Sequence, residues 1–150
     1  GTVKLGDFGI ALGERARTLR AASAVLKGKY AYLAPEQVSA EPFDGRADIY
    51  SLGVTLYRAI TGRLPFEGDD WYEIARQHVE EAPPPPRKIN PAISPEFERL
   101  LLRCMAKHPD DRPLTGEELA DELTAILDQR RTGTVRSRTM AVAVSMVPRY

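Results

Sequence analysis

Cysteine, tryptophan and histidine are scarce in this 150-residue chain, and neither sign of charge is in excess. The single cysteine excludes an internal disulfide framework and fits a reducing compartment. Lysine plus arginine equals aspartate plus glutamate at 21 each, so no overall field attracts nucleic acid or a membrane surface. We therefore expect no nucleic-acid partner.

Long apolar runs are also absent. The longest, from Met140 to Val147, is interrupted by Ser145 and is far shorter than the ~20 residues that a membrane-spanning helix needs. No signal peptide opens the sequence. We expect no membrane span in this segment and a cytoplasmic location, with any anchor of the parent protein outside this segment.

What the chain does have is the composition of one globular domain, with 43% apolar and 28% charged residues. A chain of this length can bury a fair core. Cys104 falls within an apolar helical pattern, which indicates a buried, inert thiol and not a nucleophile.

The middle of the chain shows helical periodicity. Apolar residues recur at helical spacing from Arg46 to Ile60 and predict a helix that Thr61-Gly62 ends. A second helix is predicted from Asp69 to about Glu81. The four prolines within residues 82–86 cannot continue that helix and should be extended, as a spacer in preference to an SH3-type ligand.

Two further helices are predicted near the end of the chain. One begins at Ser94-Pro95, a cap followed by proline at the first helical position. The other begins at the capping box of residues 115–118 and carries an apolar stripe to Leu127. Residues 128–150 form a basic tail that we expect to be disordered. At the other end, residues 2–5 alternate like a short strand.

Five short motifs follow one another along the chain, and only six residues precede the first of them. The second begins 27 positions after Asp7. The motifs are Asp7-Phe8-Gly9, Ala34-Pro35-Glu36, Asp48-Ile49-Tyr50-Ser51-Leu52-Gly53, Gly62-Arg63-Leu64-Pro65-Phe66 and His108-Pro109-Asp110-Asp111-Arg112-Pro113.

This ordered set resembles the protein kinase family, and most of all its bacterial, eukaryotic-like serine/threonine branch. The resemblance implies a mainly α fold: a truncated C-terminal lobe of the protein kinase-like fold with a short N-terminal strand. Residues 1–127 would be a partial kinase domain, with an activation segment over residues 7–36 and a helical subdomain over residues 37–127. The phosphate loop, the nucleotide-binding lysine and the general base lie upstream in the family, so no catalytic residue is expected in this chain.

The resemblance also assigns roles to individual residues. Asp7 would hold Mg²⁺ beside ATP, Phe8 would pack under the N-terminal lobe, and Gly9 would let the loop reorient. Glu36 and Arg112 would form a buried ion pair, whose rupture costs roughly 3–5 kcal/mol. These assignments make Asp7, Phe8 and Gly9 the expected cofactor-binding residues.

Asp48 would hold the backbone of the catalytic loop, a structural role. Because that loop lies upstream, we expect a buried and unpaired carboxylate at this position, at a cost in stability. For Trp71, His78 and His108 no partner is visible in the sequence, and packing in the core or on the surface is the favoured interpretation.

The loop between the first two motifs is basic and carries two candidate phosphorylation sites, Thr18 and Ser23. A phosphate there could pair with neighbouring arginines and order the loop; an unmodified loop is the alternative. Serine/threonine kinases usually place threonine after the glycine at the substrate-docking end, whereas this chain has Gly28-Lys29. Lysine cannot accept a hydrogen bond there, so either the register of the motif shifts or the parent enzyme is atypical.

The function that the resemblance implies is transfer of the ATP γ-phosphoryl group to serine or threonine hydroxyls of a protein substrate. The parent protein would be the enzyme, and the missing N-terminal half of the kinase would be the partner of this fragment. We expect the fragment alone to be inactive and poorly folded, because the helix at residues 46–60 lacks its usual neighbours. The alternatives are a non-catalytic binding or scaffold module and a pseudokinase parent.

Overall fold

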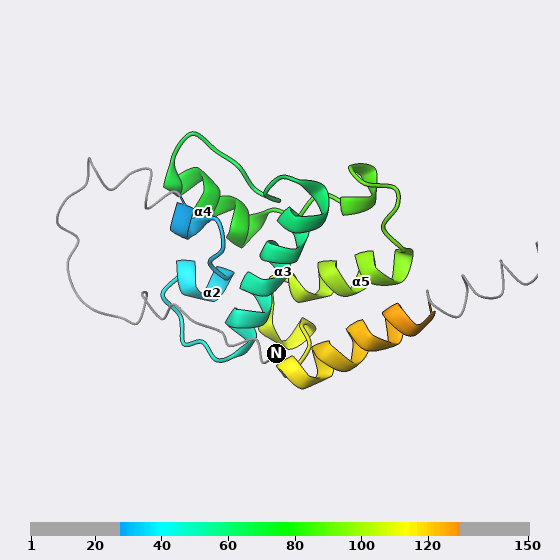
Figure 1. The fold of residues 1–150 in the computed structure, drawn as a ribbon. Helices are drawn as coiled ribbons and strands as arrows, with labels where there is room; N and C mark the ends of the chain where they lie inside the picture. Colours follow the sequence, from blue (N-terminus) through cyan, green and yellow to red (C-terminus); the bar gives the residue numbers. More distant parts are fainter. Residues whose placement is uncertain (1–27, 130–150) are drawn as a thin grey trace, which may run out of the picture.

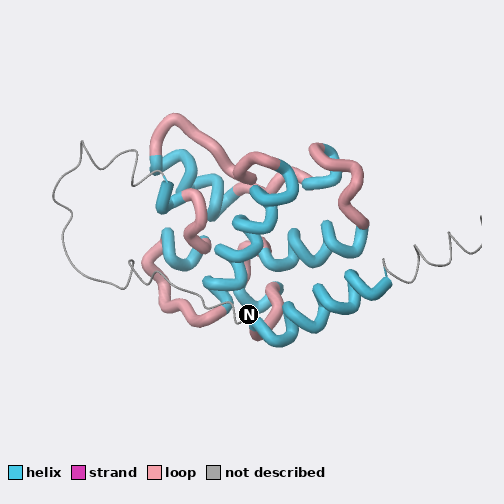
Figure 2. The backbone as a smooth tube through the Cα atoms, in the orientation of Figure 1, coloured by secondary structure: helices cyan, strands magenta, loops and turns pink. Residues whose placement is uncertain are grey.

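The computed structural model describes residues 28–129, and all elements named below belong to that range. Helices and their connections make up this part of the chain, and no strand occurs within it (Figure 2). The prediction of a mainly α fold is therefore confirmed. The predicted strand at residues 2–5 lies outside the described residues, as does most of the predicted tail.

The longest labelled helix, α3 (Arg46–Thr61), runs through the middle of the fold (Figure 1). On one side lie α2 (Pro35–Val38) and α4 (Trp71–Glu80), which contact each other. On the other side lie α5 (Pro95–Cys104), which packs against α3, and a helix over residues 116–129. The arrangement leaves α3 as the element that both sides share.

Both ends of α3 match the prediction to within one residue. Gly62 follows the last helical residue with φ of 79°, a left-handed conformation that glycine adopts without steric cost. Its N–H donates to the carbonyl of Arg58 at 2.9 Å, which satisfies one of the free carbonyls of the last turn.

The other three predicted helices are confirmed, and each begins at a side-chain cap. In the helix at residues 116–129, only half of the predicted capping box is made in the expected way, because Glu118 accepts instead from the N–H of Leu114 at 2.8 Å. The three cap bonds are Glu73 N–H to Asp70 Oδ1 at 2.8 Å, Phe97 N–H to Ser94 Oγ at 3.3 Å and Glu118 N–H to Thr115 Oγ1 at 3.1 Å.

The proline-rich connection after α4 is non-helical through Pro85, as predicted. The prediction is wrong at Pro86, which is buried and opens a 3₁₀ turn, η1 (Pro86–Lys88). The segment is fixed to the core because the hydroxyl of Tyr57 donates to the carbonyl of Pro84 at 3.1 Å. A second 3₁₀ turn, η2 (Pro109–Asp111), follows α5.

Close approach of α3 to α5 depends on Gly53. A Cβ atom at this position would lie 2.9 Å from Cγ of Met105 and 3.0 Å from Cβ of Cys104, closer than packed carbon atoms approach. Cys104 itself is buried, and burial raises the pKa of its thiol to about 11. The prediction of a buried thiol is therefore confirmed.

The core lies mainly between α3 and the elements on its α2 and α5 sides. Its largest cluster of buried residues is Ala34, Ala47, Tyr50, Val54, Tyr57, Phe66, Leu101 and Met105. A second cluster joins α3 and α5 to the helix at residues 116–129 and consists of Ile49, Leu100, Cys104 and Leu119.

A groove that we call the open groove follows α3 beside the helix at residues 116–129. It has two parts, of about 380 and 520 Å³. Leu52, on its wall, is 40% exposed, and Leu127 is 61% exposed. Asp48 lies at the α3 N-terminal end of the groove. The apolar residues lining the two parts include Ile49, Leu52, Leu119 and Leu123, and Ala59, Ile60, Phe97 and Ile126.

Candidate functional site

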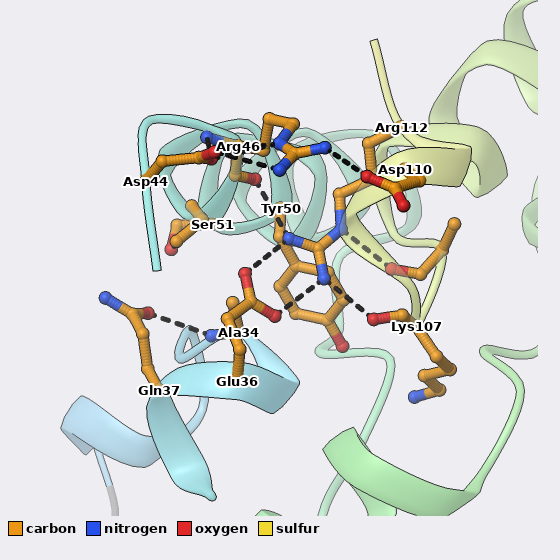
Figure 3. Close-up of polar contacts among 12 residues, drawn as sticks. Ala34, Glu36, Gln37, Asp44, Arg46, Tyr50, Ser51, Lys107, Asp110 and Arg112 are labelled. Carbon is orange, nitrogen blue, oxygen red and sulfur yellow. Dashed lines mark hydrogen bonds and ion pairs between the residues drawn. The ribbon is translucent and has the colours of Figure 1, made fainter. Parts of the chain in front are cut away.

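A buried ion pair joins two segments that lie 76 positions apart in the chain (Figure 3). Arg112 Nη1 donates to Glu36 Oε1 at 2.6 Å, and Nη2 donates to Oε2 at 2.8 Å. The side chains are 0% and 5% exposed. Burial opposes ionisation of Glu36, but the hydrogen bonds from Arg112 and the backbone, together with the charge of Arg112, outweigh it and hold the pKa below its usual value.

Arg112 uses its remaining N–H groups on backbone carbonyls. Nε donates to Ala106 at 2.8 Å, Nη1 to Arg46 at 3.0 Å and Nη2 to Lys107 at 2.9 Å. The guanidinium also lies over the ring of Tyr50, 5.0 Å from its centroid. One buried cation thus connects α2, the start of α3 and the segment after α5, with its donors satisfied.

Tyr50 extends this network to α4. Its hydroxyl lies 2.9 Å from Nδ1 of His78, and both side chains are fully buried. Burial raises the pKa of Tyr50, so the hydroxyl stays protonated and shares one hydrogen bond with the imidazole. The sequence interpretation of His78 as a packed residue holds, but it missed this bond.

His78 is held in its neutral form. Burial and the nearby ammonium group of Lys107 lower its pKa to about 4, against a small opposing effect from the backbone of Ala31. Nε2 makes no hydrogen bond within residues 28–129. The ring of Phe66 meets the imidazole edge-on, with centroids 4.9 Å apart.

Lys107 ties the end of α4 to the same region. Its Nζ donates to the carbonyls of His78 at 2.6 Å and Gln77 at 3.1 Å, in the last turn of α4. It also lies 4.5 Å from the ring centroid of Phe66. Burial lowers the pKa of Lys107 to about 8, so the side chain is still mainly charged at neutral pH. A cation at this helix end is favourable.

The residues just before α2 are anchored by the side chains of α3. Ser51 Oγ donates to the carbonyl of Tyr32 at 2.8 Å, and Arg58 Nη1 donates to the hydroxyl of Tyr32 at 2.6 Å. Tyr30 stacks on Trp71 of α4, with ring centroids 4.9 Å apart. Residues 28–32 are therefore positioned by two helices.

A surface ion-pair network lies at the start of α3 (Figure 3). Arg46 pairs with Asp44 at 2.9 Å and with Asp110 at 2.6 Å. Hydrogen bonds from Arg46 lower the pKa of Asp44. Both carboxylates are largely exposed, so we expect these pairs to add little to stability.

The prediction for Asp48 is wrong in one respect. Its side chain is exposed within the described part of the chain, not buried. It stands in the first turn of α3, where water and the positive end of the helix stabilise a carboxylate. No desolvation cost therefore arises here, and the expected loss of stability at this position does not follow.

Several predicted site residues cannot be placed. Asp7, Phe8 and Gly9 lie outside the described residues, as do the candidate phosphorylation sites Thr18 and Ser23. Within residues 28–129, no group of three histidine, cysteine or acidic side chains could hold a metal ion. No helix in this range is long and apolar enough to cross a membrane.

Sequence reasoning did not find the roles of Tyr50, His78, Arg58 and Lys107. Tyr50 and Ser51 both lie in the motif of residues 48–53, and no other feature of the sequence indicated their roles. The partners of all four residues are distant in sequence; Tyr50 and His78, for example, are 28 positions apart. No helical or strand spacing connects such residues, so periodicity could not have predicted their contacts.

The comparison with protein families agrees with this geometry. The family model for the protein kinase domain matches residues 1–124. This match covers the ion pair, α3 and α4. The chain therefore belongs to the protein kinase domain family.

Bacterial protein kinases are among its relatives. The chain is 40% identical over 134 residues to the tyrosine-protein kinase MasK of Myxococcus xanthus, covering 89% of this chain and 21% of that protein. It is 37% identical over 147 residues to the serine/threonine-protein kinase PknB of Mycolicibacterium smegmatis, covering 97% of this chain and 23% of that protein. The chain thus spans just over a fifth of the length of these curated relatives.

Proposed function

We propose that this chain is the C-terminal part of the catalytic domain of a bacterial serine/threonine kinase. The observation that carries this proposal is the Glu36–Arg112 pair within a chain that matches the kinase family model. The pair anchors the end of the predicted activation segment to the helical subdomain. The parent protein would transfer the γ-phosphoryl group of ATP to protein hydroxyls.

The proposed division of labour gives this chain the metal-binding and substrate-docking parts. Asp7 would hold Mg²⁺, with Phe8 and Gly9 beside it, and the metal would neutralise charge on the phosphate oxygens of ATP. The segment that ends at residues 28–32 would dock the substrate, and α4 would help to bind partners. The proposed setting is the cytoplasm.

The open groove supports the proposal that an upstream half of the kinase domain packs against this chain. It exposes Leu52 and Leu127 along α3 and the helix at residues 116–129, and an apolar surface of this kind is typical of an interface. In this proposal the upstream half of the domain packs there and brings the general base. Asp48, exposed at one end of the groove, would then meet the backbone of the catalytic loop.

The test uses the full-length parent protein, radiolabelled ATP and a protein substrate. We expect phosphate transfer that Asp7→Asn abolishes and that yields phosphoserine or phosphothreonine on hydrolysis. The matched control is Asp121→Asn, at an exposed aspartate of the helix at residues 116–129, outside the predicted metal site. Transfer that survives Asp7→Asn would refute the assignment of Asp7, and phosphotyrosine alone would refute the serine/threonine specificity.

A non-catalytic module is the second candidate, and Lys29 favours it. The lysine is exposed directly after Gly28, where the resembled enzymes usually present a threonine hydroxyl. Absence of transfer by the full-length protein, restored by Lys29→Thr, would support this candidate. Unchanged transfer by the Lys29→Thr variant would count against it.

A further inference from the structure

A pocket of about 600 Å³ lies between residues 28–32, α3 and the connection from α3 to α4. Its lining includes Tyr32, Arg58 and Phe66, with Glu67 and Asp69 on the connection. The pocket therefore adjoins the segment that would dock a protein substrate. The charge of a ligand that binds in this pocket depends on which of these side chains lacks an ion-pair partner.

Among the described residues that line this pocket, Arg58 is the one cation. It is exposed and donates one N–H group to the hydroxyl of Tyr32 at 2.6 Å. Within residues 28–129, no carboxylate lies within ion-pair distance of its guanidinium, including those of Glu67 and Asp69. By contrast, Arg46, Arg103 and Arg112 each hold at least one carboxylate at 2.6 Å.

The bond to Tyr32 gives Arg58 a fixed position. Tyr32 is held at its carbonyl by Ser51 as well as at its hydroxyl by Arg58. A guanidinium keeps further N–H donors after making one bond, and a carboxylate can accept two of them. The pocket thus presents a positioned, unpaired bidentate donor on its α3 wall.

We propose that Arg58 is a specificity-determining residue that selects protein substrates with an aspartate or glutamate near the phosphorylated hydroxyl. The proposal rests on the kinase function proposed above. Glu67 and Asp69, on the connection that also lines the pocket, disfavour a second acidic residue near them. The expected preference is therefore confined to the peptide position that reaches Arg58.

The experiment measures phosphorylation of matched peptides by the full-length parent kinase. Each peptide carries aspartate, alanine or lysine at one position around a single threonine. At one position we expect KM to be lower for aspartate than for lysine by about fivefold, the upper range for an exposed ion pair. Because Arg58 touches no reacting atom in this proposal, kcat should be alike.

Three variants separate charge from positioning. Arg58→Glu should reverse the order of the aspartate and lysine peptides. Tyr32→Phe removes the hydroxyl but keeps the cation, so the order should persist with a smaller ratio. Arg63→Glu makes the same charge change at an exposed arginine that does not line the pocket, and it should leave the order unchanged.

A binding measurement makes the outcome independent of catalysis. Fluorescence anisotropy of the same labelled peptides with the full-length protein should show the same order of affinities and its reversal by Arg58→Glu. Equal KM and equal affinity for aspartate and lysine peptides would overturn the proposal, as would a preference that Arg58→Glu does not change. Absence of phosphate transfer together with an Arg58-dependent binding preference would instead refute the kinase function alone.

Discussion

On one side of α3, Tyr50 and Tyr57 are fully buried, and their hydroxyls reach partners on α4 and the proline-rich connection. Along the open groove, Leu52 is 40% exposed although it belongs to the same helix. Within residues 28–129, both tyrosines on the first side are covered, whereas the open groove leaves apolar side chains exposed. Because both surfaces belong to α3, they differ in the elements that pack against them and not in helix propensity.

The described part of the chain thus has fixed helix positions on one side of α3 and an uncovered apolar surface along the other. Directional bonds around Arg112 fix α2, α3 and the segment after α5 relative to one another. The open groove has few polar partners and depends on non-directional apolar contact. Loss of a polar partner should therefore be costly on the first side, and loss of an apolar group in the groove should be mild.

The largest expected effect comes from breaking the buried ion pair. Glu36→Ala leaves Arg112 charged and buried without its carboxylate, and we expect a loss of roughly 3–5 kcal/mol in the free energy of unfolding. Urea denaturation followed by circular dichroism measures this loss. The exposed pair of Arg76 and Glu80 provides the control, since Arg76→Ala should cost about 1 kcal/mol or less. Equal costs for the two variants would contradict the distinction between buried and exposed pairs.

The helices and their ends could be predicted because their signals are local. Ser94 and Thr115 each occupy a cap position before an apolar stripe, and the structure places helices after both. The helix predicted from Asp69 begins at Trp71, after the cap Asp70. The 3₁₀ turn at Pro86 could not be predicted in this way. It depends on burial of Pro86, a tertiary contact that overrides the extended tendency of the proline run.

The site was only partly predictable for a similar reason. The juxtaposition of Glu36 and Arg112 was expected only through family resemblance, because no spacing rule relates residues 76 positions apart. The exposure of Asp48 was missed, because its burial was inferred from the role of the matching residue in the family and not from this sequence. The bond between Tyr50 and His78 gave no signal in a single sequence.

A second, smaller effect should appear on acidification. The pKa of His78 is lowered to about 4 in the folded chain, so the unfolded chain binds this proton more readily between pH 6.5 and 4. Its contribution to stability is complete above pH 6.5 and falls by at most about 1.4 kcal/mol for each pH unit down to about pH 4. Fluorescence of the single tryptophan, Trp71 on α4, can follow unfolding in urea at each pH.

Carboxylates also titrate in this range, so the comparison between variants isolates His78. His78→Gln keeps a hydrogen-bonding group for the hydroxyl of Tyr50 but does not titrate, and it should flatten the pH dependence between pH 6.5 and 4. His108→Gln makes the same substitution at an exposed histidine and provides the matched control. An unchanged slope in His78→Gln would show that this imidazole is not the group responsible.

The smallest expected effect lies in the open groove and tests the comparison most directly. Leu52→Ala removes a 40% exposed side chain, whereas Leu101→Ala makes the same change at a residue of α5 that is 1% exposed. We expect about 2–5 kcal/mol for Leu101→Ala, because a buried cavity forms, and less than about 1 kcal/mol for Leu52→Ala, because much of its surface is already hydrated. Urea denaturation over a range of protein concentrations gives both values.

A cost for Leu52→Ala that equals that of Leu101→Ala in dilute, monomeric protein would mean that another part of the chain covers the groove. A cost that rises with protein concentration would mean that a second copy does.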